Sequence, residues 1–331
     1  MNVQRAIEKL KSKRVLITGG AGFIGSNLSK RLLSEGIQVV VLDNLSTGKQ
    51  ENITPLLKYE NFTFIEGDIT DTNACYQAVK GVDVISHQAA LGSVPRSIEF
   101  PHNTHRVNAT GYLNMLHTAK ESGVKRFVYA SSSSVYGDSK ISPKTIGSEG
   151  RLLSPYAVTK QLNEMYANVY KTLHNVETIG LRYFNVFGPN QDPEGVYAAA
   201  IPKFLDKMIS GEVVTIHGDG EQTRDFTFVD NAVNANILAL ATENEEAFGK
   251  VYNIACGQFL SLNNVVSSMR MILEREGKLH SETQVVNGPE RPGDIRDSLA
   301  DISDTTKDLG YEQPVLFDEG IEKYIASVLN V

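Results

Sequence analysis

The first half of the chain alternates continuous apolar runs with stretches of helical spacing. The apolar runs are Arg14–Thr18, Ile37–Leu42, Phe62–Ile65, Val82–Ile85 and Lys125–Ala130. Between the first two runs, Leu28, Leu32 and Leu33 recur at the spacing of one helix face. Continuous apolar strands that alternate with helices are typical of a parallel sheet covered on both faces. The pattern therefore predicts an α/β fold with a doubly wound parallel sheet, since parallel crossovers are right-handed.

The pattern is less regular beyond about residue 180. Glycine and proline cluster there, and the expected elements are short strands and helices at Val213–Ile216, Asp225–Val229, Asp230–Thr242, Val251–Ile254 and Ser261–Arg275. We expect residues 1–180 to form a Rossmann domain and residues 181–331 to form a smaller mixed α/β lobe, with some segments returning to the first domain. A cleft between the two parts would be the place for a substrate.

Composition excludes several classes of protein. The 331 residues carry a net charge of −7, which argues against broad binding to nucleic acid or to anionic membranes. No apolar run approaches the roughly 18 residues that a spanning helix needs. Cys75 and Cys256 lie far apart and form no disulfide framework, so we expect the reducing cytoplasm. His102 and His105 lack Glu or Cys partners at a metal-ligand spacing, so no metal is expected.

A glycine-rich turn follows the first apolar run. Gly19, Gly22 and Gly25 have the spacing G-x-x-G-x-x-G and precede a helical stretch. Glycines at such a place let the backbone approach a pyrophosphate, which sits at the helix N-terminus. The alternative is a tight turn with close packing of helix and strand.

Carboxylates end the second and third runs. Asp43 lies 18 residues after Gly25, where a carboxylate accepts hydrogen bonds from an adenosine ribose and repels a 2′-phosphate. This position predicts NAD rather than NADP. Asp68 is placed to reach the adenine edge. The alternatives are a strand-end cap for Asp43 and a turn aspartate for Asp68.

Hydroxyl groups gather after the fifth run. Ser131–Ser134 would lie at a strand end that faces the ligand crevice, although serines are also common in turns. Tyr156 and Lys160 are one helical turn apart. A tyrosine base needs its pKa lowered from ~10 by about 3 units, roughly 4 kcal/mol, which Lys160 and a nicotinamide cation would favour. Taken alone, the pair is an ordinary helix surface pair.

Together these motifs resemble the extended short-chain dehydrogenase/reductase superfamily. Five segments, 19–28, 42–48, 87–97, 181–189 and 218–226, closely resemble the nucleotide-sugar 4-epimerases. Two more, 197–203 and 290–301, resemble the subgroup that acts on UDP-N-acetylhexosamines. The resemblance covers essentially the whole chain and implies an NAD-dependent 4-epimerase that interconverts UDP-GlcNAc and UDP-GalNAc. UDP-glucose and UDP-galactose are further expected substrates.

The resemblance assigns roles residue by residue. It implies Tyr156 as the acid/base, Ser132 as its hydroxyl partner and Lys160 as its modulator. The implied cofactor contacts are Gly19, Gly22, Phe23, Ile24, Gly25, Asp43, Asn44, Asp68, Ile69, Ala89, Asn108, Tyr156, Lys160 and Tyr183. The implied substrate contacts are Gly92, Ser93, Ser132, Ser133, Ser134, Asn185, Ala199, Ala200, Arg224, Arg291, Asp294 and Ser298. Arg224 and Arg291 match the family's diphosphate arginines, unless they form surface ion pairs with Asp225 or Glu290.

Three other functions remain open from the sequence. A UDP-hexuronate 4-epimerase shares most of the motifs. Dehydratases of this kind carry Asp-Glu, and decarboxylases carry Glu, where this chain has Ser133 and Ser134. A non-catalytic NAD sensor would be expected to lack Tyr156 or Lys160.

The resemblance also implies a homodimer formed by helices near Ile98–Glu121 and Tyr156–Leu173.

Overall fold

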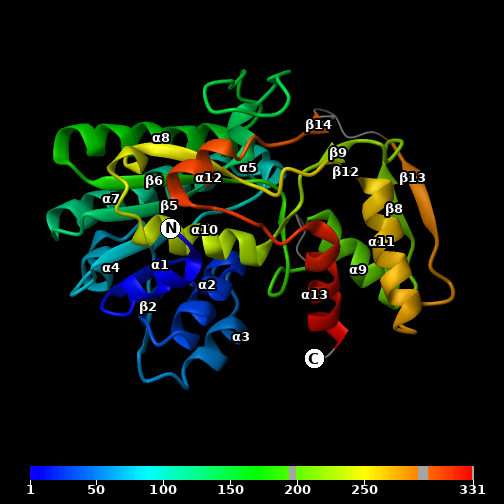
Figure 1. The fold of residues 1–331 in the computed structure, drawn as a ribbon, viewed down its shortest axis with the longest axis horizontal. Coiled ribbons are helices and arrows are strands. Elements are labelled where there is room, and N and C mark those ends of the chain that lie inside the picture. Colours follow the sequence, from blue (N-terminus) through cyan, green and yellow to red (C-terminus); the bar gives the residue numbers. More distant parts are fainter. Residues whose placement is uncertain (194–198, 290–296, 330–331) are drawn as a thin grey trace.

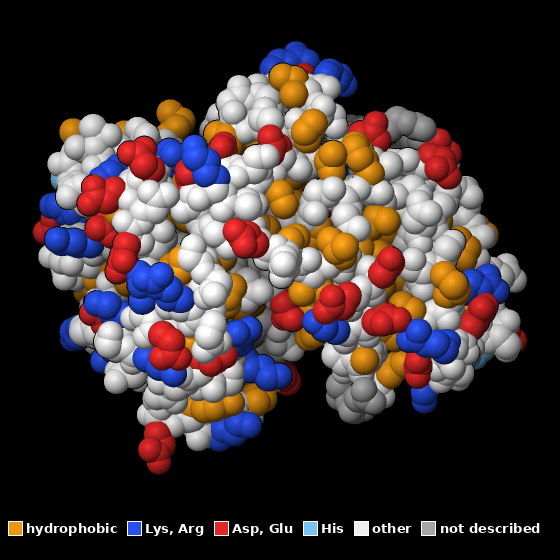
Figure 2. Space-filling view, in the orientation of Figure 1, with side chains coloured by type: hydrophobic (Ala, Val, Ile, Leu, Met, Phe, Trp, Pro, Cys, Tyr) orange, Lys and Arg blue, Asp and Glu red, His pale blue; other side chains and the backbone are white. Residues whose placement is uncertain are grey.

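The computed structural model describes residues 1–193, 199–289 and 297–329. Figure 1 shows two unequal parts, a larger one in which helices flank a sheet and a smaller one at the other end of the molecule. The smaller part contains α9 (Ala200–Ser210), α11 (Leu262–Arg275) and the C-terminal α13 (Phe317–Leu329). On the face in Figure 2, acidic and basic side chains are interspersed and form no extended patch of one sign.

Within the described residues, the larger part is built on a sheet of seven parallel strands. In spatial order they are β11 (Lys250–Ile254), β6 (Glu177–Tyr183), β5 (Arg126–Ser132), β4 (Val84–His87), β1 (Arg14–Thr18), β2 (Gln38–Asp43) and β3 (Phe62–Glu66). The chain order reverses at β1, because β2 and β4 lie on its two sides. Ligands bind outside the carboxyl ends of strands at such a switch point. The predicted doubly wound sheet is confirmed.

Strands of this sheet contribute to two separate cores, one on each face. In β1, Val15 and Ile17 belong to one buried cluster and Leu16 to the other, because successive side chains point to opposite faces. The flanking helices are α1 (Val3–Leu10), α2 (Phe23–Ser34) and α10 (Val229–Ala241) on one face, and α4 (Thr72–Ala78), α7 (Tyr112–Glu121) and α8 (Pro155–His174) on the other. Burial on both faces explains why these strands are continuous apolar runs in the sequence.

Shorter helical segments connect these elements. They are α3 (Gln50–Ile53), α5 (Val94–Glu99), α6 (Pro101–His105), α12 (Ser303–Leu309), a π-helical segment at Arg106–Gly111 and 3₁₀ turns at Thr54–Leu56, Ser133–Tyr136 and Glu245–Ala247.

The remaining strands are short and pair in three small groups. They are β7 (Val186–Phe187) with β10 (Thr227–Phe228), β8 (Val214–His217) with β13 (Val285–Gly288), and β9 (Thr223–Arg224) with β12 (Leu260–Ser261) and β14 (Asp297–Ser298). The strand predicted over Asp225–Val229 is wrong in extent, since only Thr227–Phe228 is a strand and Val229 begins α10. The chain passes here from β9 in one small sheet to β10 in another, so no single strand can span the segment.

Two elements of the second half pack with the large sheet. The strand β11 pairs with β6 at the sheet edge, and α10 packs against β4, β5 and β6. The sequence analysis placed both ranges in the looser second half, because an apolar run does not show which sheet it joins.

Candidate active site

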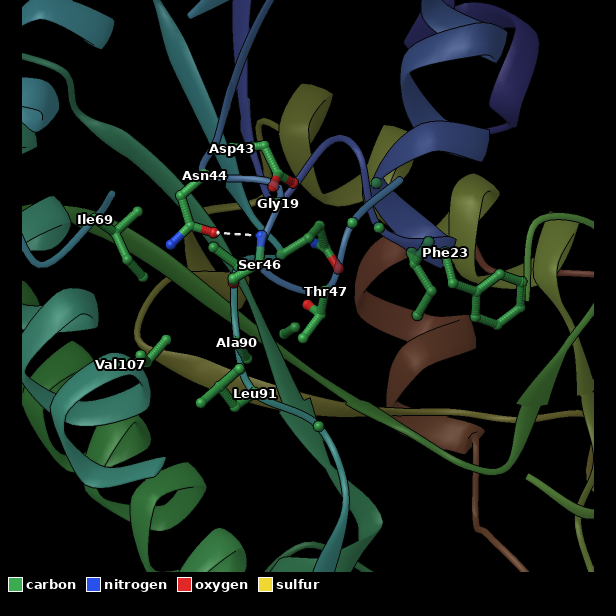
Figure 3. A pocket seen from close by; sticks show the side chains of 18 of the residues that line it. Gly19, Phe23, Asp43, Asn44, Ser46, Thr47, Ile69, Ala90, Leu91 and Val107 are labelled. Carbon is green, nitrogen blue, oxygen red and sulfur yellow. Dashed lines mark hydrogen bonds between the residues drawn. The ribbon is translucent and has the colours of Figure 1, made fainter. Parts of the chain in front are cut away.

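A cleft opens at the carboxyl ends of the central strands. Most of its lining comes from the ends of β1, β2, β3, β4 and β5 and from the start of α8. The lining residues are Gly19, Gly22, Phe23, Ile24, Gly25, Leu42, Asp43, Asn44, Ser46, Thr47, Gly48, Gly67, Asp68, Ile69, Gln88, Ala89, Ala90, Leu91, Gly92, Val107, Ala130, Ser131, Tyr156, Lys160 and Tyr183. In Figure 3, Asp43 and Asn44 lie on one side of this cleft and Leu91 and Val107 on the other. The structure thus brings together the predicted glycines, both aspartates and the Tyr–Lys pair.

The glycine turn is too crowded for side chains. Gly19 has a φ of +70°, and a Cβ there would lie 2.6 Å from the backbone nitrogen of Ala89. A Cβ at Gly25 would lie 2.2 Å from the carbonyl oxygen of Gly19. Glycine therefore lets β1, the segment after β4 and the start of α2 approach one another, which leaves the N-terminus of α2 facing the cleft.

Asp43 ends β2 and holds the loops on either side of it. Its carboxylate accepts hydrogen bonds from the N–H of Ala21 at 2.9 Å and of Leu45 at 2.8 Å. Burial raises the pKa of Asp43, and these two N–H groups oppose the rise. The residue both caps the strand and lines the cleft, and its contact with a ribose stays a prediction.

Asp68 and Asn44 form a polar pair at the same rim. The Asn44 amide donates to Asp68 at 2.9 Å, and the N–H of Thr70 donates to Asp68 at 2.7 Å. The side chain of Asn44 also accepts a hydrogen bond from the N–H of Ser46, drawn in Figure 3. Burial works to raise the pKa of Asp68, but these hydrogen bonds and Arg106 hold it below its ordinary value.

The Tyr–Lys pair lies at the start of α8, where Ser154 caps the helix and Pro155 occupies its first turn. The Lys160 ammonium donates to the carbonyl oxygen of Ala130 at 2.7 Å and lies 5.8 Å from the centre of the Tyr156 ring. Ala130 and Ser132 both belong to β5, so the end of this strand and the first turns of α8 meet at the cleft.

The ionisation of this group differs in one respect from the sequence argument. Burial raises the pKa of Tyr156, and Ser132 rather than Lys160 opposes the rise. Burial also lowers the pKa of Lys160 to about 8, against the attraction of Glu164 one turn further along α8. The protein groups alone therefore favour a neutral phenol, and a phenolate needs a further positive charge in the cleft.

Tyr183 is held by a buried polar network that the sequence analysis missed. Its hydroxyl donates to Gln88 at 3.1 Å and accepts from the Asn236 amide at 2.7 Å. The amide of Gln88 also donates to Asn236 at 3.0 Å. Asn236 comes from α10, and no local motif marks it.

Asn108 is placed behind the cleft rather than in its lining. It is buried, accepts a hydrogen bond from the N–H of Leu91 at 2.7 Å and donates to the carbonyl of Leu91 at 3.1 Å. Leu91 itself lines the cleft. The cofactor contact that the resemblance implied for Asn108 stays a prediction, and its observed contacts shape the cleft wall from behind.

The residues expected at the substrate are distributed over several elements. Arg224 in β9 and Ser298 in β14 are register partners of a parallel pair. The amide of Asn185 donates to the carbonyl of Asp225 at 3.1 Å. The remaining expected residues with described positions are Gly92 in the cleft wall, Ser93 capping α5, Ser133 and Ser134 in the turn after β5, and Ala199 and Ala200 at the start of α9. Arg291 and Asp294 lie outside the described residues.

Other lining residues were not anticipated. They include Ser46, Thr47 and Gly48 after β2, Gly67 after β3, and Ala90 and Leu91 after β4. Their shared signal is position, since each follows a parallel strand. Extending each predicted strand by six residues would have found them.

The cleft fits a dinucleotide. A helix N-terminus behind glycines suits a pyrophosphate, and the carboxylate of Asp43 is placed beside that turn. Small and apolar residues such as Ala89, Leu91 and Val107 line its wall, where flat rings pack. Tyr156 and Lys160 line the same cleft, so a dinucleotide held there would adjoin an ionisable pair.

Comparison with known proteins gives the same class. Residues 15–255 match the NAD dependent epimerase/dehydratase family, and the chain belongs to this family, whose cofactor is NAD. The UDP-glucose 4-epimerase of Mycolicibacterium smegmatis is 34% identical over 319 residues, covering 96% of this chain and 99% of that protein.

Solved structures of UDP-sugar 4-epimerases are similar to this chain over nearly all of its length. The UDP-N-acetylglucosamine 4-epimerase from Methanobrevibacter ruminantium M1, in complex with UDP-N-acetylmuramic acid, is 35% identical with a TM-score of 0.88, covering 96% of this chain and 98% of that chain. The UDP-glucose 4-epimerase from Thermotoga maritima, with UDP-glucose, is 33% identical with a TM-score of 0.87, covering 96% and 99%. No helix in the described ranges is both long and apolar enough to cross a membrane.

Proposed function

We propose that this protein is a UDP-sugar 4-epimerase that interconverts UDP-GlcNAc and UDP-GalNAc and also accepts UDP-glucose and UDP-galactose. The observation that carries the proposal is that Tyr156 and Lys160 line one cleft with the end of β5, where Lys160 is anchored to the carbonyl of Ala130. This arrangement can hold and move one proton beside a bound dinucleotide. The NAD sensor alternative is disfavoured, because it does not need this arrangement.

In the proposed reaction, bound NAD supplies reversible hydride transfer at C4 of the sugar. Tyr156 takes the proton of the sugar 4-hydroxyl. The Ser132 hydroxyl donates a hydrogen bond to the oxygen atoms between which this proton moves, the sugar 4-oxygen and the phenol oxygen. The positive charge of a bound nicotinamide would favour the phenolate, because the protein groups alone leave Tyr156 neutral, and Lys160 holds its ammonium near the ring. The 4-ketosugar then turns about its diphosphate and presents its other face. Because the hydride would return to C4 on that face while Tyr156 returns the proton to the 4-oxygen, the configuration at C4 is inverted.

The turn after β5 favours epimerisation over elimination. A dehydratase needs an additional acid/base to remove water from the ketosugar. Ser133 and Ser134 occupy the two places before Val135, and their neutral hydroxyls do not serve as that base near neutral pH. A UDP-hexuronate 4-epimerase shares the catalytic residues and remains the main alternative.

The choice of N-acetylhexosamines rests on Ser298. In the resembling family, the residue at this place lines the wall beside the 2-substituent of the sugar, and a tyrosine there restricts the pocket to plain hexoses. Ser298 is the register partner of Arg224, and register partners project their side chains to the same face. The small side chain of Ser298 would leave room for an N-acetyl group beside the diphosphate anchor, and Gly92 and Ser93 would lie near that group.

Product analysis tests the proposal directly. The protein is incubated with UDP-GlcNAc, UDP-glucose and UDP-GlcNAcA, and the configuration at C4 is read by NMR. We expect inversion with UDP-GlcNAc and with UDP-glucose. Inversion of UDP-GlcNAcA alone would support the hexuronate alternative, and loss of water or carbon dioxide would support the dehydratase or decarboxylase.

The substitution Ser298→Tyr tests whether Ser298 forms the wall of the pocket beside the 2-substituent of the sugar. We expect it to abolish turnover of UDP-GlcNAc and UDP-GalNAc by steric clash while sparing UDP-glucose and UDP-galactose. The control is Asp297→Tyr, because the adjacent residue of β14 faces the other way and is exposed. Equal loss with both substrate sets, or unchanged activity with N-acetyl sugars, would show that Ser298 is not the wall.

We also propose a homodimer. Val158, Met165, Val169 and Leu173 of α8 are between 46% and 69% exposed and recur at helical spacing, so they form one apolar stripe. Ile98 and Phe100 add exposed apolar surface near α5 and α6. Such a stripe is typical of a helix that packs against a partner.

A cytoplasmic location remains the expectation drawn from the separate thiols of Cys75 and Cys256.

A further inference from the structure

Asp225 is a fully buried carboxylate that the proposed reaction does not use. Its Oδ1 accepts a hydrogen bond from the N–H of Cys256 at 2.9 Å. Its Oδ2 accepts from the N–H of Gly257 at 3.0 Å and of Ala300 at 3.3 Å. The first two N–H groups lie in the loop after β11 and the third lies after β14, so one side chain joins two segments to the end of β9.

The backbone of Asp225 meets the residues proposed to hold the nucleotide sugar. Its N–H donates to the carbonyl of Ser298 at 2.9 Å, and its carbonyl accepts from the Asn185 amide at 3.1 Å. Arg224 precedes it directly. Successive residues of an extended chain project to opposite faces, so the inward carboxylate of Asp225 leaves Arg224 on the face that it shares with Ser298.

The surrounding strands need such a connection. Both β9 and β14 are two residues long, and strands this short have little stability of their own. Hydrogen bonds to a charged acceptor are roughly twice as strong as those between neutral groups. A buried carboxylate is costly without donors, and here the backbone N–H groups supply them.

We propose that Asp225 is a positioning residue that fixes Asn185, Arg224 and Ser298 relative to one another before the nucleotide sugar binds. The inference rests on the proposed function, because these three residues are its proposed substrate contacts. Asp225 itself touches neither cofactor nor sugar in this account. It acts by fixing the backbone segments that carry Arg224, the proposed diphosphate contact, and Ser298, the proposed wall of the sugar pocket.

The substitution Asp225→Asn isolates this role. The amide keeps the shape of the side chain but turns one acceptor oxygen into an N–H₂ donor that faces backbone N–H groups. We expect the affinity for UDP, measured by calorimetry on the full NAD-loaded protein, to fall about tenfold through the lost charged hydrogen bonds. NAD affinity should stay within twofold, since β9 and β14 contribute no residue to the described lining of the cofactor cleft.

The matched control is Asp297→Asn. Asp297 is an exposed carboxylate on the same strand pair, and it accepts a hydrogen bond from Thr223 at 2.7 Å. We expect its UDP affinity to match that of the wild type. In kinetics, Asp225→Asn should raise KM for the UDP-sugar and change kcat much less, which a role confined to folding stability would not produce.

The outcomes separate the two proposals. Failure of the wild type to bind UDP would contradict the proposed function. UDP binding by the wild type with equal affinity in Asp225→Asn, or parallel loss of UDP and NAD affinity, would overturn the role of Asp225 alone. If the variant does not fold, amide hydrogen exchange of the wild type tests the inference instead. We expect the backbone amides of Cys256, Gly257 and Ala300 to be protected from exchange in the absence of UDP. Protection that appears only when UDP is bound would overturn the inference.

Discussion

The cofactor cleft and the substrate region are built in different ways. The cleft lies at the ends of long parallel strands, so its residues share one rule of placement, the carboxyl end of a strand. The part of the proposed substrate region that lies beyond residue 180 is assembled from the two-residue strands β9 and β14, a turn after β6 and the start of α9. Its proposed contacts with described positions are spaced along the chain from Asn185 to Ser298.

This difference separates what the fold provides from what single residues provide. The larger sheet, buried on both faces, positions the Gly19 turn, Asp43 and Tyr156 as parts of one rigid layer. The smaller region depends on individual polar contacts such as that of Asp225 with Ala300. Substitutions in the cleft should therefore affect chemistry and cofactor choice, whereas those in the smaller region should affect which sugar nucleotide binds.

The largest expected effect concerns chemistry in the cleft. Tyr156→Phe keeps the ring and removes the ionisable oxygen, so turnover should fall by about 10²–10⁴ while UDP affinity stays unchanged. Steady-state kinetics and calorimetry measure the two quantities. The control is Tyr76→Phe, since Tyr76 is an exposed tyrosine of α4. Turnover close to that of the wild type would eliminate Tyr156 as the base. It would also contradict the assignment of chemistry to the cleft and of sugar-nucleotide binding to the smaller region.

A smaller effect concerns cofactor choice. Asp43→Ala removes a carboxylate that would bind the ribose, so the preference for NAD over NADP should fall by about 10–100-fold. The ratio of the two affinities, measured on stripped protein, is the readout, because loss of the bonds to Ala21 and Leu45 weakens both. In Asp68→Ala the ratio should be unchanged, since both cofactors share the adenine. Equal binding of NAD and NADP by the wild type would refute the ribose argument.

The smallest effect is a pH dependence of stability. Burial lowers the pKa of Lys160 to about 8, so the folded cofactor-free protein binds this proton less tightly than the unfolded chain does. The charged lysine therefore costs stability below about pH 8, and the cost declines as the pH rises toward the unfolded value. The free energy of unfolding should gain about 1 kcal/mol from this group between pH 7 and pH 9. Urea unfolding of wild type and Lys160→Met at both pH values measures it, and an identical pH response in the two proteins would contradict it.

The sequence predicted the cleft well because its determinants are local. The Gly19 turn, Asp43 and the pair of Tyr156 and Lys160 each combine a short motif with a position at the end of a strand or the start of a helix. Asn236 shows the limit: its amide reaches Tyr183 from α10 through the sheet interior, and nothing in its neighbourhood along the chain indicates that contact.

The extent of the elements was less predictable in the smaller region. Asp225–Val229 has the composition of a strand, but the chain changes sheets within it, and only three-dimensional pairing decides that. The pKa of Tyr156 shows a second limit, since burial raises it and Lys160, the neighbour that the helical spacing supplied, does not oppose the rise. Both failures come from contacts between residues that are distant in sequence.

The segment around Ser298 is held in place through its main chain. The carbonyl of Ser298 accepts from Asp225, that of Leu299 accepts from the N–H of Lys144 at 2.7 Å, and the N–H of Asp301 donates to the carbonyl of Lys144 at 3.0 Å. None of these bonds depends on the identity of the side chain at position 298. A substitution at position 298 would therefore leave these main-chain bonds in place, so under the proposed function the sugar that is accepted could change while the cofactor cleft keeps its structure.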